Sequence, residues 1–307
     1  MALAERWLLQ CRHGHRMCFD GDRPARYPSR LLKVEGQMAR LIDFVEERPT
    51  GPYATLSHCW VTEKFFVLTS RSLGMLRRGL PVRLFPLTFY HARFVAQRLA
   101  FQYLWIDCYC ILQGDDEASL SDWESESKQM GLVYANGTLN KGTSHASSPD
   151  QGCFSQRPSS SGPHAIIDYA PEQSGRIVRL KITRGILFTE SLFNPSLEPE
   201  PLERRAWCVQ EIILCRRVLW FGAQEICWQC AHCIEVTEHR PSDRFNEAYA
   251  LRRPLPGLLT GSSLARARLI EIDQFSYRKL ELFVRCDSSR PTQDKLRAIE
   301  GIASLVG

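Results

Sequence analysis

The stretch YLWIDCYCIL, residues 103–112, decides the fold prediction. It is a continuous apolar run interrupted only by Asp107, which is typical of a strand buried on both faces. The preceding stretch, LTFYHARFVAQRLAFQ, predicts a helix with an apolar face made of Phe89, Ala92, Ala96 and Leu99. Before it, YATLSHCW (53–60) predicts a first core strand. The order strand, helix, strand predicts a parallel βαβ unit.

Further elements follow along the chain. Ser121 and Glu124 form a capping-box pattern that predicts the start of another helix. AWCVQEIIL (206–214) predicts a helix, and RRVLWFGAQEICWQC (216–230) predicts a β-hairpin that turns at FGAQ. The last fifty residues are charged and are expected to be helical.

The predicted fold class is therefore α/β, with a mostly parallel central sheet flanked by helices, an added β-hairpin and C-terminal helices. We divide the chain into a lead-in segment packed on the core (1–50), an α/β domain (51–215) and a hairpin with a helical extension (216–307).

Composition excludes several classes of function. The 307 residues carry a net charge of only +5, without a dense Lys/Arg block, so nucleic acid is not an expected partner. No apolar run approaches the roughly 18 residues of a membrane span. The start of the chain does not have the pattern of a signal peptide, so the 12 cysteines are expected to be reduced thiols in a cytoplasmic protein.

Polar residues gather where the two predicted core strands end. Ser57, His58 and Trp60 end the first strand, and Asp107 and Cys110 end the second. Ligands of parallel α/β sheets bind beyond the carboxyl ends of the strands. If the two strands are neighbours, these side chains face one crevice.

Glu126 is the sharpest single feature of this region, because it falls between Trp123 and Met130 on the apolar face of a predicted helix. Burial penalises a charged carboxylate, and the resulting rise in pKa would suit acid-base catalysis or binding of a sugar hydroxyl. The alternative is structural: Glu126 pairs with an arginine or caps strand-end amides.

The neighbouring groups also have ordinary interpretations. His58 could be a satisfied core residue, and Asp107 could cap a turn. A nucleophilic pair of Cys110 and His58 is supported by no motif.

Two cysteine-rich stretches could supply zinc ligands. CWQCAHC contains Cys227, Cys230 and Cys233, and CRHGHRMC contains two cysteines and two histidines, Cys11, His13, His15 and Cys18. Neither has the paired CxxC spacing of a strong zinc site, and buried thiols are common in protein cores. The sequence therefore predicts no metal site.

No dinucleotide-binding glycine motif, Walker lysine loop or GxSxG elbow is present. Several blocks instead resemble, in the right order, those of the HET (heterokaryon incompatibility) domain family of filamentous fungi. These blocks are YATLSHCW (53–60), YLWIDCYCILQGD (103–115), DWESESKQMGLVYANG (122–137), GCFSQR (152–157) and RRAWCVQEIIL (204–214). The lead-in WLLQCRHGHRMC (7–18), the strand PSRLLKVEG (28–36) and DKLRAIEGIA (294–303) extend the resemblance outside the core.

The resemblance implies a TIR-like fold, because HET domains resemble TIR domains, several of which hydrolyse NAD. On that resemblance, Glu126 would bind the nicotinamide ribose, with His58 and Asp107 as further catalytic candidates. Other positions in the blocks would bind substrate: Trp60 or Trp123 by stacking, Arg157 or Arg205 through phosphates, and Ser57, Cys110, Gln113, Trp207, Gln210 and Glu211. Val61 replaces the glycine that usually follows the tryptophan of the first block.

Three functions follow as hypotheses. The first is a self/non-self or cell-death signalling module with latent NAD hydrolase activity, switched on by homo-oligomerisation or by an incompatibility partner. The second is an interaction domain without catalysis. The third is an enzyme of fungal secondary metabolism that binds a small molecule in the same crevice. No cofactor is expected, and NAD would be a substrate.

Overall fold

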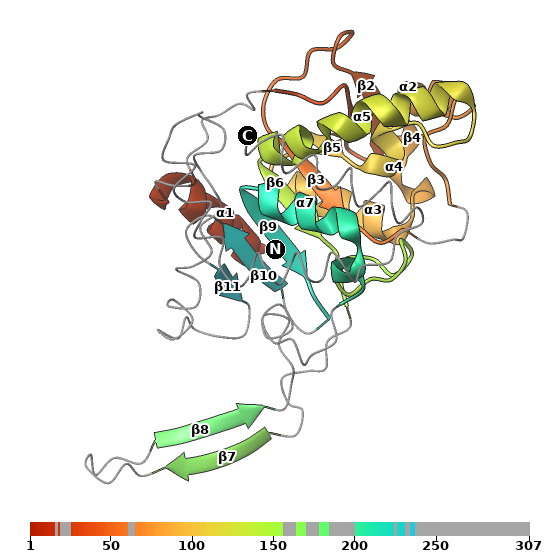
Figure 1. The fold of residues 1–307 in the computed structure, drawn as a ribbon. Helices are drawn as coiled ribbons and strands as arrows, with labels where there is room; N and C mark the ends of the chain where they lie inside the picture. The colour runs from red at the N-terminus through yellow and green to blue at the C-terminus, as the bar shows by residue number, and fades with distance from the viewer. Residues whose placement is uncertain are drawn as a thin grey trace, which may run out of the picture.

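The computed structural model describes residues 1–15, 18, 26–60, 65–155, 164–169, 178–183, 200–223, 226–230 and 234–236. Among them, nine strands form one sheet in the order β11-β10-β9-β6-β3-β5-β1-β2-β4 (Figure 1). Two further strands, β7 (His164–Tyr169) and β8 (Val178–Thr183), pair as a separate antiparallel hairpin. The helices expected in the last fifty residues lie outside the described part of the chain.

The centre of the large sheet is parallel. It consists of four neighbouring strands: β5 (Tyr103–Trp105), β3 (Tyr53–Ser57), β6 (Leu139–Gly142) and β9 (Arg217–Phe221). The connection from β3 through α3 (Leu87–Arg98) to β5 confirms the predicted parallel βαβ unit. All residues of these four strands are buried, as expected for strands covered on both faces.

Antiparallel strands extend both sides of this centre, so the sheet is mixed rather than mostly parallel. One side carries β1 (Arg30–Glu35), β2 (Met38–Asp43) and β4 (Leu80–Pro81). The other carries β10 (Ile226–Cys230) and β11 (Ile234–Val236). The pairs β1–β2 and β9–β10 have short connections, which allow only antiparallel pairing. β4 instead pairs with β2, and β1 with β5, from distant parts of the chain. The predicted hairpin of β9 and β10 is confirmed, and its strands belong to the main sheet.

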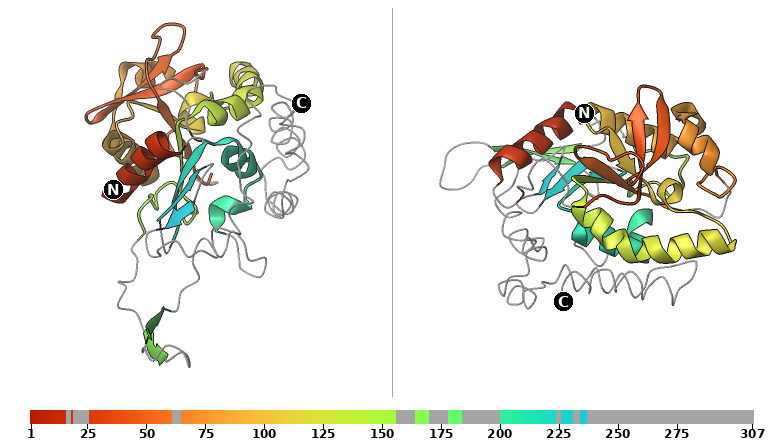
Figure 2. Two further views of the ribbon diagram at one scale, coloured as in Figure 1. Left: turned by 90° about the vertical axis from the view of Figure 1, so that its left-hand side faces the viewer. Right: turned by 90° about the horizontal axis from the view of Figure 1, so that it is seen from above.

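Helices cover both faces of the parallel centre. The helices α5 (Glu117–Asn136) and α7 (Ala206–Leu214) lie side by side over one face (Figures 1 and 2). Neighbouring residues of a strand point to opposite faces, so Asn140 of β6 faces these helices, whereas Lys141 reaches the Ala92 carbonyl of α3 on the other face.

The remaining helices are α1 (Ala2–Gly14), α2 (Leu73–Arg78), α4 (Asp107–Cys110) and the short 3-10 turns η2 (Val82–Leu84) and η3 (Pro201–Arg204). α1 packs against β10 through Trp7 and Trp228, whose ring centroids are 6.5 Å apart. The lead-in (1–50) therefore contacts the sheet at two places: α1 packs on β10 on one side of the parallel centre, and β1 pairs with β5 on the other.

Two predicted boundaries were wrong. The strand predicted over 103–112 ends at Trp105, and residues 107–110 form a helical turn, so Cys108 and Cys110 do not alternate along a strand. The pairing of β5 with β3 ends at Trp105, and beyond it the Ile106 carbonyl accepts hydrogen bonds from the Tyr109 and Cys110 amides, which form the turn. Helix α5 begins at Glu117 instead of after Ser121, because Asp116 caps it by accepting from the Ser119 amide.

Gly142 tests the packing of the parallel centre. A Cβ atom at this position would lie 2.6 Å from Cε3 of Trp220, whose side chain is fully buried. We expect Gly142→Ala to lower the free energy of unfolding by about 2–3 kcal/mol, because the indole cannot retreat in a filled core. Gly74→Ala is the matched control: its nearest atom is the flexible Arg78 guanidinium at 3.5 Å, and we expect a change within about 1 kcal/mol. Equal effects in urea denaturation would contradict this packing.

Candidate functional site

The ends of β3 and β5 meet at one edge of the sheet, because the two strands are parallel neighbours. The indole Nε1 of Trp60 donates to Oδ2 of Asp107 at 2.7 Å. Nδ1 of His58 lies 3.7 Å from Oδ1 of Asp107, and the His58 ring packs edge-on against Phe89 with centroids 4.9 Å apart. The first strand therefore delivers an imidazole and an indole to the acid that follows the second.

Helix α7 and its N-cap add two charged residues to the same place, Arg205 and Glu211. Arg205, at the N-cap of α7, donates from Nη1 to the His58 carbonyl. Glu211, one turn and a half along the helix, receives hydrogen bonds from Ser57 and from Tyr134 of α5. We call Ser57, His58, Trp60, Asp107, Arg205 and Glu211 the strand-end cluster.

Burial sets the charge states of this cluster. It raises the pKa of Glu211 to about 7, and the charge of Arg205 and the hydrogen bond from Ser57 offset part of that rise. Burial also lowers the pKa of His58 to about 4, against the opposing effect of Asp107, so His58 is neutral at pH 7. A carboxyl group whose pKa is near 7 can both give and accept a proton at neutral pH, which acid-base catalysis requires.

Gln210 stands out beside Glu211. Its side chain is 0% exposed, and within the described part of the chain neither its amide oxygen nor its amide nitrogen has a hydrogen-bond partner. Nε2 of His58 is also buried without a hydrogen-bond partner among the described residues. Buried polar atoms are nearly always satisfied in native proteins, so a ligand or water could complete the hydrogen bonds of these atoms, of which His58 Nε2 belongs to the strand-end cluster.

Glu126 belongs to a different group of charges. It is 7% exposed, as the apolar face predicted, and its Oε1 lies 3.7 Å from Nη2 of Arg30 on β1. The same guanidinium binds Asp122 through Oδ2 at 2.7 Å. Burial raises the pKa of Glu126, and Ser29 and Arg30 lower it. This is the geometry of the structural alternative, in which the buried acid is paired with an arginine.

The thiols near the strand ends are not activated nucleophiles. Burial raises the pKa of Cys110 to about 12 and that of Cys108 well above its ordinary value, so both are protonated at neutral pH. With a pKa of about 4, His58 is too weak a base to deprotonate either. The ligand atoms of His58, Asp107 and Cys108 lie within 4.8 Å of one another, but Asp107 already binds Trp60 and the Cys108 amide. The triad is therefore a poor metal site.

Other predicted ligand-binding residues lie at the margin. Trp123 and Trp207 are half-buried on α5 and α7 and pack against the core. Gln113 donates from Nε2 to the Ile111 carbonyl at 2.9 Å and so supports its own turn. Arg157 and Val61 lie outside the described residues.

The sequence prediction missed three buried polar groups. Nδ2 of Asn140 donates to Oγ of Ser57 at 2.9 Å and so holds the hydroxyl beside Glu211, while Tyr134 reaches both Ser57 and Glu211. Lys141 is fully buried, and burial lowers its pKa to about 7. The available signal was the run Asn140-Lys141 inside a short strand, where polar residues are expensive to bury.

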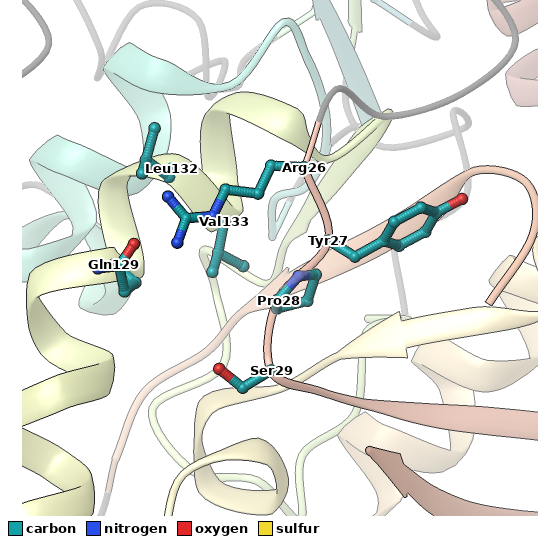
Figure 3. A pocket seen from close by; sticks show the side chains of 7 residues that line it. All are labelled: Arg26, Tyr27, Pro28, Ser29, Gln129, Leu132 and Val133. Atoms are coloured by element: carbon teal, nitrogen blue, oxygen red, sulfur yellow. The ribbon is translucent and has the colours of Figure 1, made fainter. Parts of the chain in front are cut away.

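A small pocket lies away from the strand-end cluster, between residues 26–29 and α5 (Figure 3). Its cavity volume is about 30 Å³, which holds a water molecule but is far below the roughly 300 Å³ of a small ligand site. Gln129 lines it, and its buried Oε1 has no partner among the described residues, so a water bound there would satisfy it. We do not regard this pocket as a substrate site.

Glu211 makes a pH-dependent contribution to stability. A carboxyl with a raised pKa binds its proton more tightly in the folded than in the unfolded state, so its contribution is fully present below about pH 4.5 and is lost as the pH rises through about 7. Glutamine does not titrate, so we expect Glu211→Gln to remove this loss. The free energy of unfolding of the variant minus that of wild type should then increase by on the order of 1–3 kcal/mol from pH 5 to pH 8. Chemical denaturation across this range measures it.

The difference between the two proteins is the informative quantity, because His58 has the opposite dependence between about pH 4 and 6.5. A constant difference from pH 5 to 8 would show that Glu211 titrates normally.

Comparison with known proteins agrees with the motif order. The model of the family described as heterokaryon incompatibility protein (HET) matches residues 53–211, which include β3, β5, β6, α5 and the first two-thirds of α7, up to Glu211. No curated protein and no solved structure matches the chain. None of the helices in the described residues is long and apolar enough to cross a membrane. By this match over more than half of its length, the chain belongs to the heterokaryon incompatibility (HET) family.

Proposed function

We propose that this HET-family chain is a self/non-self recognition and cell-death signalling module whose strand-end cluster binds NAD and hydrolyses its bond to nicotinamide. The proposal rests on the burial, the raised pKa and the position of Glu211. This residue is a buried carboxyl with a pKa of about 7 at the carboxyl ends of parallel strands, the place where α/β sheets bind ligands.

The chemistry asks little of the protein beyond binding and charge. As the bond between C1′ of the ribose and the nicotinamide nitrogen breaks, its electron pair leaves with nicotinamide and the ribose becomes oxocarbenium-like. A nearby carboxylate stabilises that positive charge and holds a ribose hydroxyl. Water then adds to C1′ and gives up one proton, so NAD and water yield nicotinamide, ADP-ribose and a proton.

The strand-end cluster and Gln210, which precedes Glu211 on α7, supply a group for each of these tasks. Glu211 in its charged form stabilises the ribose cation and takes the proton from water. Gln210, whose amide has no partner in the described residues, offers both a donor and an acceptor to ribose or carboxamide. Arg205 carries a guanidinium suited to phosphate. Trp60, half-buried beside His58, offers a face for stacking.

In this proposal Glu126 positions rather than reacts. Its partner Arg30 lies on β1, so the ion pairs of Arg30 with Asp122 and Glu126 join α5 to β1. β1 in turn pairs with β5, which precedes Asp107. The TIR-like alternative keeps Glu126 as the reacting acid. It is supported by the position of Glu126 on the first long helix after β5, and by the parallel strands that helices cover.

The proposed switch is assembly, either as a homo-oligomer or with an incompatibility partner protein. A preformed cluster in the monomer is also compatible with a small-molecule enzyme, and the dependence of the activity on protein concentration separates the two.

Nicotinamide release from NAD by the purified chain tests the proposal. We expect Glu211→Gln to lower the rate at least 100-fold, because an amide cannot stabilise the cation or accept the proton. The wild-type rate is expected to rise with pH through a midpoint near 7, where Glu211 loses its proton. The matched control is Glu124→Gln on α5, whose side chain is 59% exposed and which should keep the wild-type rate.

Glu126→Gln distinguishes the two carboxyl groups. The proposal predicts a loss smaller than tenfold, accompanied by a lower stability. If Glu126→Gln abolished nicotinamide release and Glu211→Gln retained it, Glu126 would be the reacting acid, as in the TIR-like alternative. No release from wild type at dilute or crowded concentration would overturn the hydrolase and favour an interaction domain.

A further inference from the structure

Four potential metal ligands converge at the end of α1. Sγ of Cys11, Cys18 and Cys230 and a ring nitrogen of His15 all lie within 4.8 Å of one another. The three cysteines are buried and His15 is half-buried. This group is separate from the strand-end cluster, because it lies between α1 and β10 instead of beyond the ends of β3 and β5.

Local structure explains why these four residues meet. Cys11 is on the last turn of α1 and His15 is its C-cap, four residues later, so both lie on one side of the helix end. On β10, residues three apart point to opposite faces. Cys230 therefore shares the face of Trp228, which packs on α1, whereas Cys227 lies on the other face. The CxxC spacing of Cys227 and Cys230 does not form a pair of ligands.

The separations match a tetrahedral site. Nδ1 of His15 lies 3.5 Å from Sγ of Cys230. Zinc bonds of about 2.3 Å to sulfur and 2.0–2.1 Å to nitrogen place tetrahedral nitrogen and sulfur ligands about 3.6 Å apart. Three thiolates and one imidazole are one of the standard ligand sets of structural zinc.

Arg217 provides the surroundings that such a site needs. It is fully buried on β9, directly opposite Cys230 in the strand pairing. Its Nε donates to Sγ of Cys11 at 3.2 Å, and Nη2 donates to the Cys18 carbonyl. A zinc ion with three thiolates carries one net negative charge, which the guanidinium balances. Hydrogen bonds to the ligands from neighbouring groups are typical of metal centres.

We propose that Cys11, His15, Cys18 and Cys230 bind one zinc ion that has a structural role. Four protein ligands fill the tetrahedron and leave no position for water or substrate. The ion ties the lead-in to β10, two segments that lie more than 200 residues apart in the chain, so it closes a long loop. The alternatives are a disulfide between two of the cysteines, or a cluster of ordinary thiols.

Metal content and cobalt spectra of the purified full chain test this proposal. We expect one zinc per chain, and after exchange with Co²⁺ we expect the intense charge-transfer and visible bands of a tetrahedral thiolate site. Cys230→Ser should weaken the apparent zinc affinity at least about 100-fold, measured by competition with a chromogenic chelator. Cys227→Ser, which changes a buried cysteine on the other face of the same strand, should retain the full zinc content.

A second pair of variants guards against misfolding. His15→Gln replaces a half-buried ligand and should alter the cobalt spectrum, while His13→Gln, which is exposed on the same helix, should not. Chelation should lower the melting temperature of wild type by more than that of His15→Gln, whose site has lost one ligand.

Three results would overturn the proposal. One is a protein that binds no zinc before or after zinc addition and whose thiols all react with a thiol reagent once it is unfolded. Another is a chain whose intact mass lacks two hydrogen atoms, with Cys11, Cys18 or Cys230 in a disulfide-linked peptide. The third is zinc bound equally well by wild type and Cys230→Ser, which would place the ion elsewhere.

Discussion

The parallel pairing of β3 with β5 on one side and β6 on the other is the constraint on which the rest depends. It brings the residues after β3 and β5 to the same edge, where α7 covers them. Removal from water then sets their chemistry: it neutralises His58 at pH 7 and raises the pKa of Glu211 to about 7. The same pairing places Asn140 beside Ser57, so the hydroxyl that reaches Glu211 is itself held in place.

Much of this fold could be predicted because hydrophobic periodicity identifies long helices and strands. The helix over 206–214, the hairpin of β9 and β10 and the parallel β3-α3-β5 unit were all predicted correctly. The stretch after Trp105 was not, because an apolar run is equally compatible with a strand and a buried helical turn. At the start of α5, Asp116 and Ser121 both have the chemistry of a cap, and only the hydrogen bond of Asp116 to Ser119 decides between them.

The sequence identified many residues of the candidate site, but it did not show which of them lie together. The apolar stripe correctly placed Glu126 in the interior, but its partner Arg30 comes from an antiparallel strand that periodicity alone could not place beside α5. Glu211 followed from a family block, whereas its raised pKa results from the surrounding helices. For the cysteines, the spacing offered two separate stretches as possible ligands and favoured neither. The fold instead brings Cys230 of one stretch to Cys11, His15 and Cys18 of the other, and leaves Cys227 on the opposite face of β10. These groupings were missed because they join distant segments, whereas the two errors in element boundaries were local.

The fold holds the carboxyl group of Glu211, with a pKa of about 7, over the ends of its parallel strands. The most direct measurement is the titration of the Glu211 carboxyl carbon by NMR in protein labelled with ¹³C-glutamate, with Glu211→Gln to assign the signal. We expect a midpoint near pH 7, because burial penalises the charged form. A midpoint near the ordinary value of about 4.5 would show that Glu211 is solvated, and would contradict both the buried cluster and the chemistry built on it.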